Sequence, residues 1–283
     1  MEAYNPRNLA ELRSALALLT MQSKILAGGT DLIIQLPKMN PVDRLLYICR
    51  VDELKSIQVS NNQVEIGAGV TMRELAQSTV IQETMPALAM AGAEMGSIQI
   101  RNHATVGGNI AGASPASDLM PVLFLLNAST LTLNPSGELI SKNIAELVTG
   151  AGRTSLKYNE ILFKIIIPIP DDKWFSAFFK LGFRKKVTIA RINAALGWSV
   201  DSDGTITKAS LFLGAIAPRP VNCECAQMLV GTKADESVIT KIADELSARI
   251  LANTPKEFDR DYKVKSVYGL LDDIGIYIRN NPK

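Results

Sequence analysis

The sequence predicts an α+β protein built from three successive pieces. A strand, a glycine loop, a helix and a second strand follow one another near the N-terminus, which is the pattern of a βαβ unit. Helices and short strands then continue up to Pro168–Pro170, where two prolines break the pattern; beyond them, long β-patterned runs are followed by helices. We therefore predict a domain over residues 1–170, divided into a βαβ subdomain (1–55) and an α+β subdomain (56–170), and a C-terminal sheet-plus-helices domain over 171–283.

The first piece opens with leucines at helical spacing, beginning near Asn8. After the glycine pair, Thr30 and Asp31 can cap a short helix, and Pro37 closes it. The expected elements are a helix with Leu9, Leu12, Leu16 and Leu19 on one face, a strand Lys24–Ala27, a helix Leu32–Leu36 and a strand Arg44–Ile48.

Caps, apolar runs and turns define the second piece. Thr71 and Glu74 have the spacing of a capping box at the start of a helix. A Pro-Ser-Gly turn joins two β-patterned runs and predicts a hairpin. The expected elements are a strand Gln63–Gly69, a helix Pro86–Glu94, an uncharged loop from Ala104 to Ser117, a helix Leu119–Leu126, hairpin strands Thr130–Asn134 and Glu138–Ser141, and a strand Ile161–Ile167.

The last piece begins with three β-patterned runs, which predict an antiparallel three-stranded sheet. They are Trp174–Phe183, Asn193–Val200 and Thr205–Gly214, and the turn Asp201–Gly204 joins the last two. Beyond Ala217–Pro220 the pattern becomes helical, and we expect three helices there.

Composition excludes several classes of protein. The net charge is +2, from 30 basic and 28 acidic residues, and no basic run is longer than Arg184–Lys186, which disfavours nucleic-acid binding. No apolar run approaches the roughly 18 residues of a membrane span. The N-terminal start is acidic and does not read as a signal peptide, so we expect a cytoplasmic protein.

Histidine and cysteine are too scarce for most metal sites. A four-ligand zinc or iron–sulfur site would need nearly all of His103, Cys49, Cys223 and Cys225, and no C-x-x-C pair is present. A Ser-His-Asp triad would depend on His103 alone. We predict no metal site, and any redox centre must be an organic cofactor or belong to a partner.

Two glycine pairs stand beside small polar residues, in Ala27–Asp31 and Thr105–Asn109. Glycine lets backbone N–H groups approach an anion closely, and a helix N-terminus adds partial positive charge. We expect the two loops to converge on a pyrophosphate, with side chains absent because a ligand takes their place. The alternative is that both are tight turns. Neither a P-loop nor the dinucleotide G-x-G-x-x-G fingerprint is present, because Gly67-Ala68-Gly69 leads to Met72 at the last position.

Asp118 follows the uncharged stretch and allows two interpretations. It can cap the helix that runs to Leu126, or stabilise its first turn. It can also accept hydrogen bonds from the sugar hydroxyls of a nucleotide or flavin.

Three segments closely resemble the FAD-binding subunit of molybdenum hydroxylases, the xanthine dehydrogenase and carbon monoxide dehydrogenase family. They are Lys24–Asp31 (KILAGGTD), Ile100–Asn109 (IRNHATVGGN) and Ser114–Asp118 (SPASD). The likeness covers essentially the whole chain and continues in Ile66–Thr71, Asn159–Leu162 and Phe175–Lys180.

The resemblance implies a two-part FAD-binding domain of the vanillyl-alcohol oxidase type, followed by a smaller C-terminal domain. It implies that Asp118 contacts the polar chain of the flavin, that Leu162 lines the isoalloxazine slot, and that Lys180 reaches the cofactor from the C-terminal domain. Leu162 can equally be a core residue, and Lys180 can lie on a solvated strand face. The loop residues that would wrap the FAD pyrophosphate are Lys24, Ile25, Leu26, Ala27, Gly28, Gly29, Thr30 and Asp31, opposed by Thr105, Val106, Gly107, Gly108 and Asn109.

Two positions bear on how the flavin is held. Met95 stands where xanthine dehydrogenases tend to place an aromatic ring; a methionine can still pack on the ring edge. His103 is the single candidate for a covalent flavin link, and its place in the Ile-Arg-Asn-x-Ala run favours a structural role. We therefore expect non-covalent FAD.

In such enzymes a large subunit carries the molybdopterin cofactor and a small subunit carries two [2Fe-2S] clusters. The resemblance thus implies an electron-transfer subunit, in a complex expected to be a dimer of heterotrimers, that delivers electrons to NAD+ or another acceptor. We assign no catalytic residue to this chain. Two alternatives remain: a stand-alone flavin oxidoreductase, which would need its own substrate pocket and base, and a flavin-free scaffold subunit.

Overall fold

The computed structural model describes residues 1–171 and 173–281. The chain forms two compact units, each assembled from segments that are distant in sequence. The first unit comprises Met1–Ser78, Ser97–Ser114 and Asn127–Ile169, and the second comprises Thr79–Gly96, Pro115–Leu126 and Pro170–Lys283. Two segments that precede residue 170, Thr79–Gly96 and Pro115–Leu126, thus pack in the same compact unit as the residues that follow it.

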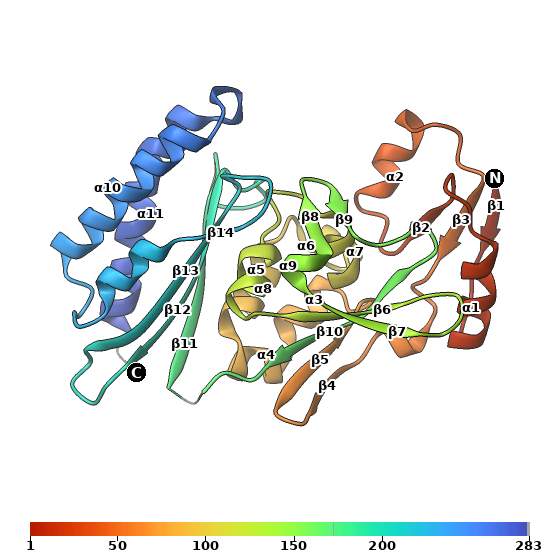
Figure 1. Ribbon diagram of the computed structural model, residues 1–283, viewed down its shortest axis with the longest axis horizontal. Helices are drawn as coiled ribbons and strands as arrows, with labels where there is room; N and C mark the ends of the chain where they lie inside the picture. Colours follow the sequence, from red (N-terminus) through yellow and green to blue (C-terminus); the bar gives the residue numbers. More distant parts are fainter. Residues whose placement is uncertain (172, 282–283) are drawn as a thin grey trace. The chain divides into compact units, whose positions relative to one another are not determined.

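The first unit begins with the expected βαβ arrangement (Figure 1). Asn8 caps the first helix by accepting a hydrogen bond from the Glu11 backbone N–H, and Leu12 and Leu16 are fully buried. A short strand at the N-terminus, absent from the prediction, pairs in parallel with β3, so the strand order is β1-β3-β2. The elements are β1 (Glu2–Tyr4), α1 (Leu9–Leu18), β2 (Lys24–Leu26), α2 (Leu32–Gln35), a 3-10 turn (Leu36–Lys38) and β3 (Arg44–Tyr47).

An antiparallel five-stranded sheet forms the rest of the first unit's framework, in the order β4-β5-β10-β6-β7. The predicted hairpin is confirmed as β6–β7, and the predicted capping box is confirmed at Thr71 and Glu74. The strands are β4 (Ile57–Ser60), β5 (Gln63–Gly67), β6 (Ser129–Leu133), β7 (Leu139–Asn143) and β10 (Ile161–Pro168). The smaller elements are α3 (Met72–Gln77), α6 (Ile98–Arg101), α7 (Val106–Gly112), α9 (Ile144–Leu147), β8 (Val148–Gly150) and β9 (Arg153–Thr154).

The expectation of one uncharged loop from Ala104 to Ser117 is wrong for half of its length, because α7 occupies Val106–Gly112. Thr105 caps this helix, since its hydroxyl accepts a hydrogen bond from the Gly108 N–H at 3.0 Å. The cap and the packing of Gly107 outweigh the weak intrinsic helix propensity of three glycines.

A four-stranded antiparallel sheet organises the second unit, in the order β11-β12-β13-β14. The prediction of three strands missed β14, a two-residue strand directly after the proline-rich break. The prediction of three C-terminal helices is replaced by a 3-10 segment (Glu224–Leu229) and two long helices. The elements are α4 (Thr79–Thr84), α5 (Pro86–Glu94), α8 (Leu119–Leu125), β11 (Trp174–Leu181), β12 (Ile192–Val200), β13 (Ile206–Gly214), β14 (Val221–Asn222), α10 (Glu236–Asn253) and α11 (Arg260–Asn280).

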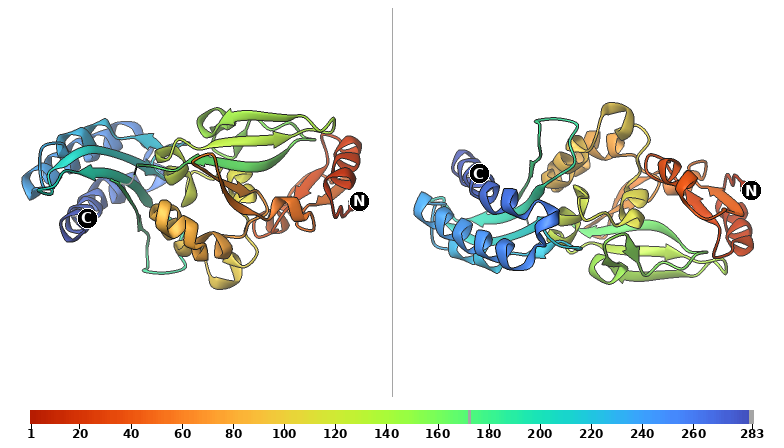
Figure 2. Two further views of the ribbon diagram at one scale, coloured as in Figure 1. Left: turned by 90° about the horizontal axis from the view of Figure 1, so that it is seen from below. Right: turned by 90° about the horizontal axis from the view of Figure 1, so that it is seen from above.

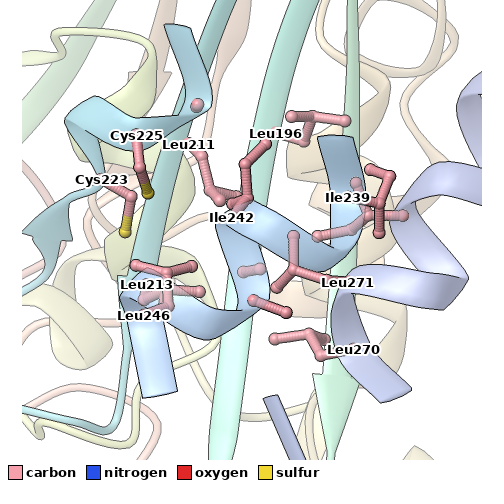
Figure 3. Close-up of a cluster of buried hydrophobic side chains, with 14 of the residues drawn as sticks. Leu196, Leu211, Leu213, Cys223, Cys225, Ile239, Ile242, Leu246, Leu270 and Leu271 are labelled. Atoms are coloured by element: carbon pink, nitrogen blue, oxygen red, sulfur yellow. The ribbon is translucent and has the colours of Figure 1, made fainter. Parts of the chain in front are cut away.

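Both faces of this sheet are covered, which explains why eight of the nine residues of β12 are buried. Alternate residues of β12, including Trp198 and Leu196 (the latter labelled in Figure 3), join the core formed with α10 and α11. On the other face of the sheet, α8 contacts β12 and β13, and α5 contacts β11. The long helices are amphipathic, and no helix in the described part of the chain is long and apolar enough to cross a membrane.

Cys223 and Cys225 lie in the same core (Figure 3). Burial raises the pKa of Cys223 to about 12 and that of Cys225 to about 11. Both thiols therefore stay protonated at neutral pH and serve as packing groups.

Replacing Leu246 in this core by alanine should lower the free energy of unfolding by about 2–5 kcal/mol, because Leu246 is buried between the sheet and the C-terminal helices and truncation leaves a cavity. Leu251 is on the same helix but 52% exposed, so Leu251→Ala should change the free energy of unfolding by less than about 0.5 kcal/mol. Urea unfolding followed by far-UV circular dichroism measures both. Equal losses for the two variants would mean that α10 does not pack on this face.

Candidate functional site

The two glycine loops lie against each other within the first unit. A Cβ atom added to Gly28 would lie 1.7 Å from the carbonyl oxygen of His103, and one added to Gly108 would lie 3.7 Å from the Ala27 Cβ. The structure thus brings together the two segments that the sequence singled out. They meet by backbone-to-backbone contact, with Gly28 directly beside the residues that precede α7.

Neighbouring protein atoms, rather than a ligand, account for two of these glycines. Gly28 faces the His103 backbone, and a Cβ at Gly107 would lie 2.5 Å from the Ala68 Cβ and 2.8 Å from the Ala68 carbonyl oxygen. The expectation that the side chains are absent because a ligand takes their place is therefore corrected for Gly28 and Gly107. Gly29 has a different reason: its φ of +74° lies in the left-handed region that favours glycine.

The second loop is tied into the central sheet through its backbone. The Ala68 N–H donates to the Phe163 carbonyl at 3.0 Å, and the Ala68 carbonyl accepts from the Gly107 N–H at 2.8 Å. The Val106 N–H donates to the Val70 carbonyl at 2.9 Å. Since the Gly108 N–H is bound by its own cap, the first N–H groups of α7 all have partners within the chain.

The first loop shows the opposite pattern. Its backbone N–H groups from Gly28 to Leu32 have no hydrogen-bond acceptor among the residues that the structure describes. Asp31, at the N-cap position of α2, does not cap it; its carboxylate instead accepts from the Gln35 amide at 2.7 Å. Successive free N–H groups in such a turn form a concave set of donors suited to an anion. This loop is therefore a candidate anion-binding site.

The residues that enter this loop anchor it. Ile25 and Ala27 pack against the core formed by α1 and the sheet, and Lys24 and Leu26 are half-buried strand residues. Thr30 is half-buried in the loop itself. The anchored strand on one side and the His103 carbonyl on the other fix the conformation of the donors.

Leu162 lies on β10, and its side chain is 4% exposed. The pairing of β10 with β6 shifts register between Leu162 and Lys164, which marks a β-bulge of the kind often found beside functional sites. The next residue, Phe163, is the one whose carbonyl holds Ala68. Leu162 therefore belongs to the framework of the second loop, and a role at a flavin ring stays a prediction.

In the second unit, Asp118 and Lys180 form a buried ion pair. The Lys180 ammonium lies 2.6 Å from Asp118 Oδ2, and the two side chains are 6% and 5% exposed. Lys180 also donates to the Glu94 carbonyl at 3.2 Å. Asn193 donates at 3.2 Å to both Asp118 Oδ1 and the Ser117 carbonyl. Both carboxylate oxygens are thereby engaged.

This arrangement excludes a capping hydrogen bond for Asp118 and a solvated position for Lys180, while their contacts with a cofactor stay predictions. Asp118 occupies the N-cap position of α8, but its side chain makes no capping hydrogen bond. Lys180 is not on a solvated face. Burial raises the pKa of Asp118 above its usual value, while Lys180 and Asn193 oppose the shift.

Asn193 was not identified from the sequence. It is fully buried, and the available signal was a single amide side chain inside the apolar run of β12, INAALGWSV. A lone buried amide implies partners for its polar atoms, but the sequence does not say which.

Met95 and His103 occupy ordinary positions in their own units. Met95 is half-buried and ends α5, directly after the residue whose carbonyl accepts from Lys180. His103 is exposed, and its contribution to the loop contact is its backbone carbonyl. No group of three or more potential metal ligands occurs in the parts of the chain that the structure describes.

Comparison with known proteins gives consistent matches along the chain. Residues 1–170 match the family described as "FAD binding domain in molybdopterin dehydrogenase", and residues 177–274 match "CO dehydrogenase flavoprotein C-terminal domain". The nicotinate dehydrogenase FAD-subunit of Eubacterium barkeri is 31% identical, over 98% of this chain and 95% of that protein. The xanthine dehydrogenase FAD-binding subunit of Escherichia coli O157:H7 is 30% identical, over 84% and 83%. A chain of the reconstituted CO dehydrogenase from Oligotropha carboxidovorans superposes with a TM-score of 0.85 at 26% identity, covering 96% of this chain and 94% of that one.

Two glycines of α7 provide a matched test of the loop packing. Gly107→Ala should lower the free energy of unfolding by about 1–3 kcal/mol, because its Cβ meets Ala68. Gly112 has no atom within 4 Å of an added Cβ, so Gly112→Ala should be neutral or stabilising by up to about 1 kcal/mol. Urea unfolding distinguishes them, and similar values for both variants would contradict the close contact.

The buried ion pair should behave as a coupled unit. Lys180→Met leaves the Asp118 charge without its cation and should lower the free energy of unfolding by about 3–5 kcal/mol at pH 7. The double variant Asp118→Asn/Lys180→Met should recover most of that loss, because no lone charge remains. The matched control is Lys208→Met, from an exposed pair, which should cost less than about 1 kcal/mol.

The pH dependence of Lys180→Met follows from the same contacts. An acid whose folded-state pKa is raised contributes stability at low pH and loses it as pH rises through that pKa. Burial raises the pKa of Asp118. The free energy of unfolding that Lys180→Met loses relative to the unmodified protein should therefore become smaller as pH falls from about 7 to 5. A deficit that is constant over this range would mean that Asp118 is solvated.

Proposed function

Because this chain belongs to the family of FAD-binding subunits of molybdopterin dehydrogenases, the molybdenum hydroxylases, we propose that it binds FAD non-covalently and transfers electrons through it. The electrons come from [2Fe-2S] clusters of a small partner subunit and leave to NAD+ or another acceptor. A large partner subunit carries the molybdopterin cofactor and the substrate chemistry, and the complex is a dimer of heterotrimers in the cytoplasm. The three free cysteines agree with a reducing compartment.

The observation that carries the proposal is the set of free backbone donors from Gly28 to Leu32. These N–H groups would hold the pyrophosphate of FAD, with no cationic side chain required. The second loop, Thr105–Asn109, would help to fix the conformation of these donors. Its own first N–H groups already have partners, and His103, two residues before it, contacts Gly28. The loop residues thus fit the pyrophosphate, which is the anionic part of the cofactor.

Three further residues are proposed contacts that rest on the family resemblance. Leu162 would line the isoalloxazine slot, and its support is its burial at a bulge in the framework of the second loop. Asp118 would contact the polar chain of the flavin and Lys180 the cofactor. These two contacts rest on the resemblance alone, since the two residues form a buried ion pair in their own unit.

When bound, a flavin supplies an electron carrier that exchanges single electrons with clusters and electron pairs with acceptors such as NAD+. The backbone donors of the first loop would bind that group by its pyrophosphate. No acid or base on this chain is needed for those steps, and no catalytic side chain is assigned.

Two variants at one position test the pyrophosphate cradle. Asparagine and aspartate both tolerate the left-handed backbone of Gly29 and differ in charge alone. Gly29→Asn should bind FAD within a few-fold of the unmodified chain, while Gly29→Asp should bind at least about tenfold more weakly, because its carboxylate repels the pyrophosphate. Quenching of flavin fluorescence on titration measures both, with the visible spectrum of the purified chain as the starting point.

The other outcomes separate the remaining functions. Equal weakening by both substitutions would mean that the anion is not held at this loop. A purified chain that neither carries nor takes up FAD would favour the scaffold subunit. Turnover of a substrate without partner subunits would favour a stand-alone oxidoreductase.

A further inference from the structure

Asn193 is a buried amide in a strand that otherwise consists mostly of apolar residues, INAALGWSV. The two long helices α10 and α11 lie along one face of the sheet to which this strand belongs (Figure 2), and Leu196 and Trp198 join the core on that side. Asn193 alternates with them and points to the opposite face. There it meets Ser117 and Asp118 at the start of α8.

The Asn193 side chain leaves one of its polar atoms unpaired. Its Oδ1 atom has no hydrogen-bond donor within the described part of the chain, and a Cβ added to Gly214 would lie 2.2 Å from that atom. A buried carbonyl without a partner lowers stability, and an apolar side chain of similar size would avoid this loss. Residues that work against stability in this way are expected chiefly at functional sites. The amide therefore indicates a role beyond packing.

The amide nitrogen of Asn193 holds one oxygen of the Asp118 carboxylate. Nδ2 lies 3.2 Å from both Asp118 Oδ1 and the Ser117 carbonyl, and these two acceptors fix the orientation of the amide. Lys180 holds the other carboxylate oxygen, Oδ2, at 2.6 Å. The terminal torsion of an aspartate side chain is broad, so the side chain alone does not fix the plane of its carboxylate. Donors on both oxygens do fix it.

Asp118 and Lys180 retain hydrogen-bonding capacity for a ligand. A carboxylate has about four lone-pair positions, and the contacts of Asp118 with Lys180 and Asn193 occupy two of them. The Lys180 ammonium has one more N–H group than it needs for Asp118 and the Glu94 carbonyl. The Lys180 and Asp118 side chains are 6% and 5% exposed, whereas Asn193 is fully buried. A ligand can therefore reach the ion pair, while Asn193 lies behind it.

We propose that Asn193 is a positioning residue of the flavin site: its hydrogen bond fixes the Asp118 carboxylate, and through it Lys180, in the orientation that contacts FAD. The inference rests on the proposed function, in which both members of the ion pair contact the cofactor. Polar groups that are already oriented lose less entropy when a ligand binds. Without the amide, the carboxylate can turn about its Cβ–Cγ bond while it stays paired with Lys180. Asn193 acts through Asp118 and is not a catalytic residue.

The test is a thermodynamic cycle on the affinity of the full chain for FAD, measured by quenching of flavin fluorescence. Asn193→Leu keeps the branching of the side chain without the amide and should weaken FAD binding by about two- to tenfold. In the neutral double variant Asp118→Asn/Lys180→Met, the same substitution should change the affinity by less than about twofold, because no ion pair remains to be positioned. Asn193→Ala, which adds no volume, should give the same pattern.

A spectroscopic measurement separates positioning from stability. Circular dichroism in the visible flavin bands reports the asymmetric surroundings of a ring that is held in one orientation. Asn193→Leu saturated with FAD should therefore give a weaker visible signal than the unmodified chain. The matched control is Leu196→Ala, which is on the same strand but in the core with α10 and α11. It should unfold at a lower urea concentration and leave FAD affinity and the visible signal unchanged.

FAD affinity and circular dichroism equal to those of the unmodified chain in both Asn193 variants would overturn the positioning role alone. Equal weakening by Asn193→Leu in the two backgrounds, or a matching loss of affinity in Leu196→Ala, would also overturn it, since the effect would then follow the stability of the fold. Unchanged affinity in the double variant would mean that the ion pair does not contact the cofactor. A chain that takes up no FAD in any form refutes the proposed function, and the positioning role with it.

Discussion

The contact between Gly28 and the carbonyl oxygen of His103 is the constraint on which the candidate site depends. The two backbones approach so closely that even a methyl group at Gly28 would overlap the carbonyl, at 1.7 Å. This approach places the free donors of the first loop beside the segment leading into α7 and fixes both. The central strand β10 is linked to this contact by hydrogen bonds: the Phe163 carbonyl accepts from the Ala68 N–H, and the Ala68 carbonyl accepts from the Gly107 N–H. The five-stranded sheet and the donor loop therefore form one connected backbone framework.

In the second unit, too, a glycine allows a close approach, here within a polar cluster. A Cβ added to Gly214 would lie 2.2 Å from Asn193 Oδ1, so a glycine on β13 leaves room for the amide on β12. That oxygen has no hydrogen-bond donor among the described residues, while the amide nitrogen serves Asp118 and Ser117. The hydrogen bonds of the amide nitrogen thus set the orientation of Asn193. The unpaired oxygen costs free energy of folding, and this cost comes with the hydrogen bond that holds Asp118.

Local signals predicted local structure well in this chain. The capping box at Thr71, the helix Pro86–Glu94 and the β6–β7 hairpin follow from neighbouring residues, and each is confirmed. Long-range packing was not readable in the same way. The glycine pairs marked two segments that meet in the fold, but the atoms that exclude side chains at Gly28 and Gly107 come from distant residues of the chain and not from a ligand. Asn193 and β14 escaped because their partners are distant in sequence or their strand is too short to show a period.

The two glycine loops differ in what their backbone N–H groups bind. The second loop uses its donors within the chain and becomes rigid, whereas the first leaves its donors free and is held from outside. Because the donors are backbone groups, most side chains between Lys24 and Asp31 can change without removing one of them. The strict requirements fall on Gly28, which must admit the carbonyl, and on Gly29, which must adopt a positive φ. A side chain at Gly28 should therefore impair the cradle most, whereas Gly29 requires only a residue that tolerates a positive φ.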